Sequence, residues 1–343
     1  MRECDAVEVV RGSVHTVFPM EEASRVGQAR RYAASLSETL GFDTVTAGRV
    51  ALVVTELGTN LVKHAQKGRL MIASREFDHR PGDIEILSID NGPGIAELDK
   101  SMQDGVSTAG TPGTGLGAAK RLSNDFDIHS TQPAGTVIVA RIRMKETEVP
   151  TFKVGIVGTA APGETVSGDG WVIAIDGVKA VLLMADGLGH GPMAEEAANV
   201  AVAHFRQKPF QDLSTMLKEV HVQLKSTRGA AMAISALDAD GATVKSLGAG
   251  NVVTRIISGV YDKTLLSQHG TAGLQIRKPE EMSTPWPPYA AIVMHSDGVT
   301  QRWPSGTIHA VLGRDPSLAA AILLRDYCRG RDDATVMVVR RSE

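Results

Sequence analysis

The sequence predicts two consecutive domains of mixed α/β structure, and three observations support that prediction. The chain has 343 residues, more than a single hydrophobic core usually organises. Its first part places two helix-like stretches ahead of strand-like ones, whereas its second part alternates short apolar strands with helices. Between the two patterns, residues 145–150 (KETEVP) are charged, end in proline and lack an apolar period. We therefore expect one domain at residues 1–147 and a second at residues 148–343.

The first domain is expected to open with two helices. Residues 22–40 and 44–65 carry apolar side chains at helical spacing, and Gly41 separates them. Strand-like runs follow at residues 83–90 (DIEILSID) and 135–144 (GTVIVARIRM).

The second domain is expected to alternate strands and helices without an internal repeat. Helical spacing marks residues 193–205 and 213–224. Four short apolar runs indicate strands: AVLLMADG at 180–187, AAMAISALD at 230–238, AAIVMHSDG at 290–298 and ATVMVVR at 334–340.

The composition predicts a globular protein of the cytoplasm. Hydrophobic residues make up 43% of the chain and charged residues 22%, and the formal net charge of -3 gives no basic excess for nucleic acid. Only Cys4 and Cys328 occur, without a CxxC pair, so neither a disulfide framework nor a zinc site is indicated. We expect no leader peptide and no apolar run long enough to cross a membrane.

A polar stripe runs along the second predicted helix. In TELGTNLVKHA, residues 55–65, Glu56, Asn60 and His64 follow one another at steps of four, and Lys63 lies beside them. A solvated polar face is the commonest origin of such a stripe. Its meaning therefore depends on the motifs that follow it.

Two glycine-rich motifs follow this stripe. DNGPGI, residues 90–95, ends a strand in an aspartate followed by two glycines, and GTGLG, residues 113–117, opens a helix. Glycine lets backbone N–H groups approach a phosphate at a helix N-terminus, where the helix dipole favours negative charge. One such motif arises by chance, but three motifs in this order predict a nucleotide site.

Together the three motifs closely resemble those of the GHKL (Bergerat-fold) ATPases. The N box matches residues 56–64, the first Gly box residues 90–94 and the second residues 113–117, and the resemblance covers about the first 145 residues. ELGTNLVKHA and GTGLGAAKRLSNDFDIHS are most similar to the small serine kinases of bacterial partner-switching systems, the RsbT and RsbW type. The resemblance implies a Bergerat-fold α/β sandwich.

The same resemblance implies roles for individual residues. Asn60 would bind a Mg²⁺ ion that bridges the phosphates of ATP, Asp90 would accept the adenine amino group, and Glu56 would act as general base toward a protein serine. Residues 96–112 would form the ATP lid, and Gly135 with Thr136 the end of the adenine pocket. The wider nucleotide-binding set includes Lys63 and His64, for which two interpretations stay open. Each could contact a phosphate, or it could face a partner or the solvent. The rest of that set is Gly92, Gly94, Gly113, Thr114, Gly115, Leu116, Gly117 and Thr136.

Acidic residues collect at strand ends of the second domain. Two strands end in Asp-Gly, at Asp186 and Asp297, while VSGDG supplies Asp169 and RDDAT supplies Asp332 and Asp333. A single Asp-Gly is commonly a turn. Several carboxylates at the strand ends of one sheet system indicate hard metal ions with oxygen ligands. A two-metal centre suits phosphate monoester hydrolysis, which is extremely slow without a catalyst.

DGLGHGPMAEEAA, residues 186–198, together with LGAGN, SDG and RDDAT, resembles the metal-dependent type 2C protein phosphatases. The similarity is greatest to their SpoIIE-like bacterial branch and its short RsbX type, and it implies an α-β-β-α sandwich over about residues 150–340. Asp186 would be the catalytic aspartate that bridges two Mn²⁺ or Mg²⁺ ions, and the Gly187 carbonyl would also bind. The remaining expected ligands are Asp169, Asp297 and Asp332, with Asp333 more peripheral.

The sequence departs from the animal type 2C pattern at two places. That pattern has a His two residues after the bridging Asp and an Arg shortly before the first acidic ligand. Here Leu188 takes the first place, and no arginine occurs between Arg143 and Arg206. His190 could protonate the leaving serine, although GHGP could equally form a tight helix start with Pro192, which we slightly favour. Phosphate binding and leaving-group protonation therefore have no assigned residues.

These motifs predict a two-headed switch enzyme. The first domain would phosphorylate a serine of a STAS-domain regulator with ATP and Mg²⁺, and the second would remove that phosphate with two Mn²⁺ or Mg²⁺ ions. In one alternative, the first domain is a nucleotide-gated module that sequesters a sigma factor or another regulator without phosphotransfer; in another, its ATPase site is degenerate. Neither nucleic acid nor a membrane is an expected partner.

Overall fold

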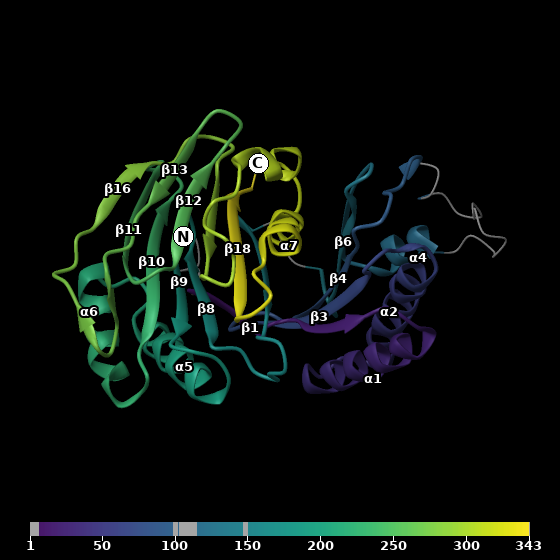
Figure 1. Cartoon of the computed structure of the whole chain (residues 1–343), viewed down its shortest axis with the longest axis horizontal. Coiled ribbons are helices and arrows are strands. Elements are labelled where there is room, and N and C mark those ends of the chain that lie inside the picture. Colours follow the sequence, from purple (N-terminus) through teal and green to yellow (C-terminus); the bar gives the residue numbers. More distant parts are fainter. Residues whose placement is uncertain (1–6, 99–101, 103–114, 147–149, 343) are drawn as a thin grey trace, which may run out of the picture. The chain divides into compact units, whose positions relative to one another are not determined.

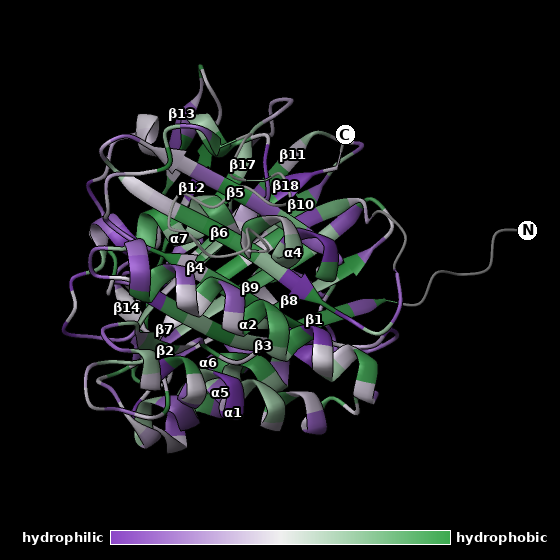
Figure 2. Ribbon diagram, turned by 90° about the vertical axis from the view of Figure 1, so that its right-hand side faces the viewer, coloured by the Kyte–Doolittle hydropathy of each residue, from purple (hydrophilic) through white to green (hydrophobic). Residues whose placement is uncertain are grey.

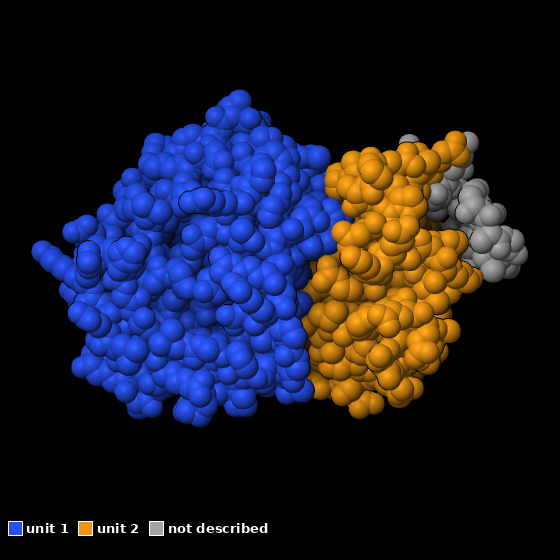
Figure 3. All heavy atoms as spheres, in the orientation of Figure 1, with its two compact units in different colours: residues 1–14, 77–79, 149–343 blue, residues 15–76, 80–148 orange. Residues whose placement is uncertain are grey.

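The computed structural model describes residues 7–98, 102, 115–146 and 150–342. Contacts divide the chain into two compact units, coloured separately in Figure 3. Unit 1 takes residues 1–14, 77–79 and 149–343, and unit 2 takes residues 15–76 and 80–148.

This division differs from the sequence expectation at the N-terminus. β1 (Glu8–Gly12) pairs antiparallel with β8 (Asp169–Asp176), with Val9 opposite Ala174. The first strand therefore belongs to unit 1, although the sequence assigned it to the first domain. A five-residue strand whose partner lies far along the chain leaves no local pattern by which its domain can be recognised.

Unit 2 is a sheet covered by helices on one face, as expected for the first domain (Figure 1). Asp43 starts the long second helix by accepting a hydrogen bond from the Thr46 backbone N–H at 2.7 Å. The buried sides of the helices and of the strands form one hydrophobic core. The strands run in the order β2-β3-β4-β6-β5, all antiparallel. The elements are β2 (Thr16–Pro19), α1 (Ala23–Thr39), α2 (Thr44–His64), β3 (Arg69–Phe77), β4 (Asp83–Ile89), α4 (Gly115–Leu122), β5 (Asp125–Thr131) and β6 (Gly135–Ile142).

Helix α2 qualifies as a membrane span by length and composition alone, with 21 residues and a mean hydropathy of 1.2, contrary to the sequence expectation. Its apolar side, including Val53, Leu57 and Leu61, is buried in the core of unit 2. The apolar character of α2 is therefore that of a core helix.

The sheet of unit 2 also carries buried charges in register. Glu85 on β4 lies directly opposite Arg141 on β6, which donates to it at 2.6 Å, and the His15 ring lies 3.1 Å from the same carboxylate. Burial alone would raise the pKa of Glu85, but Arg141 and then His15 hold the pKa well below its usual range. Charges paired across strands in this way fix the register of β4 and β6.

Unit 1 has two sheets stacked between helices, which confirms the expected α-β-β-α sandwich (Figure 1). Within this unit the first sheet runs β16-β11-β10-β9-β8-β1, and the second runs β13-β12-β17-β18-β7. The apolar inner faces of the two sheets pack on each other through Trp171, Met184, Ile292 and Met337, among others. In Figure 2 the hydrophobic colour follows such central strands, and hydrophilic residues are frequent in the surrounding loops.

Helices cover both outer faces of this sandwich. α5 (Pro192–Gln207) and α6 (Leu213–Gln223) pack on the first sheet, and α7 (Pro316–Tyr327) packs on the second. The remaining elements are β7 (Phe152–Thr159), β9 (Lys179–Gly187), η1 (Leu224–Ser226), β10 (Ala230–Asp238), β11 (Thr243–Ala249), β12 (Val253–Ile257), β13 (Asp262–Leu265), β14 (Gly270–Thr271), β15 (Gln275–Ile276), β16 (Met282–Pro285), β17 (Ala291–His295), η2 (Ser305–Val311) and β18 (Ala334–Arg341).

Candidate functional site

The N box and the second Gly box meet in unit 2. Glu56 and Asn60 lie half-buried one turn apart on α2, and α4 begins against them at Gly115. A Cβ at residue 115 would stand 3.4 Å from Asn60 Nδ2 and 3.9 Å from Glu56 Oε2. Glycine at this position therefore keeps open the space between a helix N-terminus and the carboxylate–amide pair. Unpaired backbone N–H groups at such a terminus suit anionic phosphate.

The first Gly box lies beside the end of β6. Asp90 Oδ1 accepts from the Gly92 N–H at 2.6 Å, and the Asp90 N–H donates to Thr136 O at 2.9 Å. A Cβ at Gly135, where φ is +85°, would overlap the Asp90 carbonyl oxygen. Asp90, Gly92, Gly135 and Thr136 thus form one tightly packed corner, which holds the Asp90 carboxylate in place.

Ser130, the last residue of GTGLGAAKRLSNDFDIHS, joins this corner, although the sequence alone assigned it no role. Its hydroxyl accepts from the Ile95 N–H at 2.8 Å and lies 2.9 Å from Thr136 Oγ1. Gly94, with φ +76°, passes so close to Thr131 O that a Cβ would stand 2.7 Å from it. The first Gly box is therefore fastened to β5 by one side chain and one close backbone approach.

The other expected nucleotide-binding residues are placed unevenly. Lys63 and His64 are exposed in the last turn of α2, while Leu116 is half-buried and Gly117 buried in α4. Gly113 and Thr114 lie outside the described residues, as do residues 99–101 and 103–112 of the expected ATP lid. The structure thus gives no contact by which to choose between the two readings of Lys63 and His64.

Close packing at this corner predicts a sensitive substitution. We expect Gly135→Ala to lower the free energy of unfolding of unit 2 by about 2–4 kcal/mol, because backbone strain adds to overlap with Asp90. All three tryptophans of the sequence lie in unit 1. The part of the circular-dichroism transition that comes from unit 2 should therefore move to lower denaturant concentration. The transition seen by tryptophan fluorescence, which reports on unit 1, should stay in place.

Gly41→Ala is the matched control for this substitution. Gly41 has φ +67°, but its Cβ would meet nothing within 4 Å. It should therefore lose only about 1 kcal/mol from strain. Equal losses in the two variants would contradict the close packing at Gly135.

Unit 1 brings acidic strand ends together. Asp169, at the start of β8, lies directly opposite Asp186 near the end of β9. Asp169 Oδ2 accepts from the Ser296 hydroxyl at 2.7 Å, and the next residue, Asp297, accepts from Asn251 Nδ2 at 2.6 Å. Asp169 Oδ1 is buried and has no hydrogen-bond partner among the described residues. Burying a carboxylate oxygen without a partner is unfavourable, and a bound cation would supply the missing partner.

The electrostatics of this cluster also favour a cation. Burial, and then the charges of Asp169, Asp297 and Asp332, raise the pKa of Asp186 to about 9. Burial also raises the pKa of Asp169 to about 7, despite the opposing hydrogen bond from Ser296. Burial and the charge of Asp332 raise the pKa of Asp297. Like charges gathered out of water repel one another, and a divalent ion between them would remove that penalty.

The carboxylates do not form a closed ligand shell as they stand. Among residues 7–98, 102, 115–146 and 150–342, no three His, Cys, Asp or Glu side chains are close enough together to hold a metal ion. Asp169, Asp186, Asp297 and Asp332 are near enough to influence one another's charge, and hard oxygen ligands of this kind fit Mg²⁺ or Mn²⁺. Their assignment as ligands stays a prediction.

Asp333 has a different position from its neighbour Asp332. Its Oδ1 accepts from the Ala161 N–H and its Oδ2 from the Gly168 N–H, both at 2.8 Å. Both oxygens therefore hold the backbone that leads into Asp169. Asp333 thus holds the segment before Asp169 in place and is not itself one of the expected metal ligands.

Gly187 is enclosed by backbone. Its N–H donates to Gly168 O at 2.9 Å, and a Cβ on it would overlap the Ala194 carbonyl in the first turn of α5. Glycine is therefore needed for α5 to pack onto the end of β9, which keeps the Asp186–Gly187 backbone in one place.

His190 makes a contact that the sequence did not indicate. Its Nδ1 lies 2.7 Å from Glu164 Oε1, and 57% of the histidine side chain is exposed. Gly191 precedes α5 with φ +74° beside the same glutamate. The imidazole is thus fixed at one nitrogen by a carboxylate and largely exposed, while Gly191 is the N-cap of α5 and Pro192 its first residue.

Comparison with known proteins identifies both parts of the chain. The family described as "Histidine kinase-like ATPase domain" matches residues 18–142, and "Stage II sporulation protein E (SpoIIE)" matches residues 176–342. The chain is 37% identical over 112 residues to "Serine/threonine-protein kinase RsbT" of Bacillus subtilis (strain 168), which is 33% of this chain and 84% of that protein.

Two solved structures add to these matches. One is described as "The bacterial stressosome: a modular system that has been adapted to control secondary messenger signaling"; it is 26% identical, covers 55% of this chain and 99% of its own, and has a TM-score of 0.52. The other, RsbX in complex with magnesium, is 18% identical, covers 57% of this chain and 98% of its own, has a TM-score of 0.52 and shows the fold alone. Both expected resemblances are confirmed. The chain belongs to the RsbT family, and it joins this GHKL-type, kinase-like domain to a type 2C phosphatase domain of the SpoIIE kind.

Proposed function

We propose that the protein is a two-headed switch enzyme of a bacterial partner-switching system. In this proposal unit 2 transfers phosphate from ATP to a serine of a STAS-domain regulator, and unit 1 removes it. The observation that carries the proposal is the presence in one chain of Glu56 beside Asn60 at a helix N-terminus, and of a buried carboxylate cluster at strand ends. The setting would be the cytoplasm, with a sigma factor or another regulator downstream.

For the kinase reaction, the residues of unit 2 would supply positioning and one base. Asn60 would hold Mg²⁺ at the ATP phosphates, the N-terminus of α4 would face those phosphates, and Asp90 would accept from the adenine amino group. Glu56, one helical turn from Asn60, would take the proton of the attacking serine hydroxyl. Phosphoryl transfer depends mainly on such positioning and on neutralising charge.

For the phosphatase reaction, the carboxylates of unit 1 and the Gly187 carbonyl would hold the metal ions. Two bound Mn²⁺ or Mg²⁺ ions would supply a water molecule of lowered pKa. The carboxylate oxygens of Asp169, Asp186, Asp297 and Asp332 would hold these ions. Asp333 would keep the Asp169 segment in place through its two backbone hydrogen bonds.

The test uses the full chain with Asp186→Ala, mixed with γ-labelled ATP, Mg²⁺ and each STAS-domain protein of the same cell. We expect label on a serine of one of them, and its removal when wild-type protein and Mn²⁺ are added. If no label appears while ATP still binds, unit 2 is a nucleotide-gated binding module and the phosphatase is the only enzyme.

Two opposed activities on one substrate would consume ATP without effect unless a signal favoured one of them. We therefore expect a regulatory input that biases the two activities in opposite directions, with reciprocal coupling between the signal and the favoured state.

A further inference from the structure

The phosphatase site lacks an arginine where animal enzymes carry one, and the fold offers another from a different part of the chain. Arg228 stands two residues before Ala230, the first residue of β10, and Ala230 pairs with Gly187. Between them, Gly229 O accepts from the Leu188 N–H at 3.0 Å. Arg228 is therefore attached beside the segment that follows Asp186.

The guanidinium itself lies over this segment. A Cβ at Gly189 would stand 3.2 Å from Arg228 Nη1, so the arginine head group comes close to the backbone at Gly189. The His190–Glu164 pair belongs to the same short segment. A cation and a carboxylate-held imidazole thus gather on the loop that leaves Asp186.

The backbone that carries Arg228 is fixed. Thr227 Oγ1 donates to Leu224 O at 2.8 Å and accepts from the Gly229 N–H at 3.0 Å. Gly229 has φ +82°, and a Cβ there would stand 2.6 Å from Ala272 O. The turn therefore has one conformation, which sets where the arginine side chain starts.

The head group of Arg228 is exposed and makes no ion pair or hydrogen bond with any residue that the structure describes. Arg255 of the same unit, by contrast, is engaged with Asp262 at 2.7 Å. An arginine held beside a site without a partner has its five donors available for a ligand.

A phosphate group is the ligand that this arrangement favours. The loop beneath Arg228 leaves Asp186, the expected point of reaction, and a phosphate dianion there would be attracted by the positive charge of the guanidinium. A guanidinium binds two phosphate oxygens side by side, which fixes the orientation of the group as well as its position. We propose that Arg228 binds the non-bridging phosphate oxygens of the phosphoserine substrate and so does the work of the missing upstream arginine. This proposal rests on the proposed phosphatase function.

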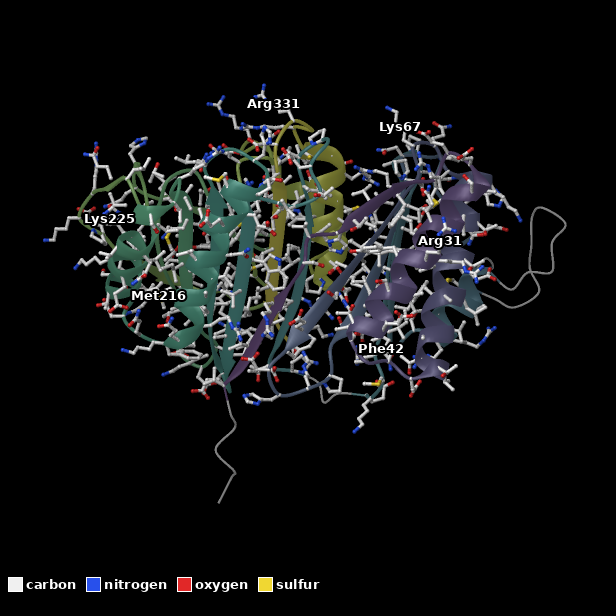
Figure 4. The ribbon with its side chains drawn as sticks, turned by 90° about the horizontal axis from the view of Figure 1, so that it is seen from below. Arg31, Phe42, Lys67, Met216, Lys225 and Arg331 are labelled. Carbon is white, nitrogen blue, oxygen red and sulfur yellow. The ribbon has the colours of Figure 1, made fainter. Side chains whose placement is uncertain are left out.

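Arg329 and Arg331 are the competing candidates. Both lower the pKa of Asp297 through their charge, so they face that side of the cluster. Figure 4 shows Arg331 projecting at the edge of unit 1, and Lys225, three residues before Arg228, projecting from it elsewhere. Lys225→Gln therefore removes a nearby surface charge without touching the site, and Arg331→Gln tests the rival.

The experiment compares the full-length wild type with Arg228→Gln, Arg228→Lys, Lys225→Gln and Arg331→Gln, all saturated with Mn²⁺. Calorimetry measures the Kd of inorganic phosphate, and hydrolysis of p-nitrophenyl phosphate gives kcat, KM and the inhibition constant of phosphate. A separate titration measures the Kd of Mn²⁺. We expect Arg228→Gln to raise the phosphate Kd and inhibition constant about tenfold, with Arg228→Lys between it and the wild type. The affinity for Mn²⁺ should not change.

Phosphate affinity in Arg228→Gln equal to that of the wild type would overturn the proposal, as would a loss seen in Arg331→Gln instead. The same loss of phosphate affinity in Lys225→Gln would show that the effect comes from general surface charge, and it would also overturn the proposal. If the wild type binds phosphate through Arg228 but hydrolyses neither p-nitrophenyl phosphate nor a phosphoserine peptide, the proposed phosphatase function fails while the binding site stands.

Discussion

Asp186→Asn should abolish phosphatase activity and at the same time stabilise the metal-free protein. The loss of hydrolysis should be on the order of 10³-fold or more, because an amide cannot supply the negative charge that a carboxylate ligand would offer to divalent ions. The gain in stability has a separate cause. Burial and the neighbouring carboxylates raise the pKa of Asp186 to about 9, so at neutral pH its charged form is disfavoured in the fold.

The pH dependence has a definite sign. Between the ordinary aspartate pKa of 3.8 and the raised value of about 9, the folded protein binds a proton that the unfolded chain has lost. The stability of the metal-free wild type should therefore be greatest at the acid end of this window and fall as the pH rises through it. Asp186→Asn has no such group, so its stability should depend less on pH. At pH 8 its free energy of unfolding should exceed that of the metal-free wild type by an amount on the order of a few kcal/mol.

Tryptophan fluorescence measures this directly, since Trp171, Trp286 and Trp303 all lie in unit 1. The unfolding midpoint should be followed from pH 5 to pH 9 in chelator, and again with Mn²⁺. Added Mn²⁺ should stabilise the wild type far more than the variant. If the variant were less stable than the wild type in chelator, the carboxylates around Asp186 would not repel one another in the way that we infer.

Glu56→Ala should abolish phosphotransfer by unit 2 while leaving ATP binding intact. The side chain lies one turn from Asn60 at the start of α4, where a serine hydroxyl would approach the γ-phosphate. Removing a general base at such a position typically lowers the rate about 10²–10⁴-fold. The measurement is single-turnover transfer from γ-labelled ATP to the STAS-domain substrate, in a chain that also carries Asp186→Ala.

Asn60→Ala is the companion variant, and it should weaken binding of ATP in the presence of Mg²⁺. Leu52→Ala provides a surface comparison from the same helix, since Leu52 on α2 is 53% exposed. Transfer that survives Glu56→Ala would remove this residue from the base role. ATP binding unaffected by Asn60→Ala would count against the metal role of the amide.

Local chemistry explains what the sequence could predict. Helices α1 and α2 each have one apolar side, and a glycine marks the break between them, so their ends were predicted closely. The strands that lead to Asp186 and Asp297 combine an apolar run with a turn signal. Each of these features leaves its own signature in neighbouring residues, and the family motifs rest on the same residues.

What the sequence missed depends on contacts between distant segments. Helix α7 is buried along most of its length, from Pro316 to Leu324, so it has no polar face to create a period. Glu164 and His190 are 26 residues apart, and no spacing rule connects them. Arg228 occupies an ordinary turn, and only the pairing of β10 with β9 brings it to Gly187.

The position of β1 has a consequence for how the protein is made. Unit 1 takes its first strand from residues 8–12, and β1 pairs with residues 173–175 of β8. During synthesis the whole of unit 2 must therefore emerge before that strand can find its place, and closing so long a loop is entropically unfavourable until the remaining chain compensates it. The kinase-like unit can complete its core first, while the phosphatase unit must wait for β8. A nascent chain should thus complete its kinase-like unit before its phosphatase-like unit.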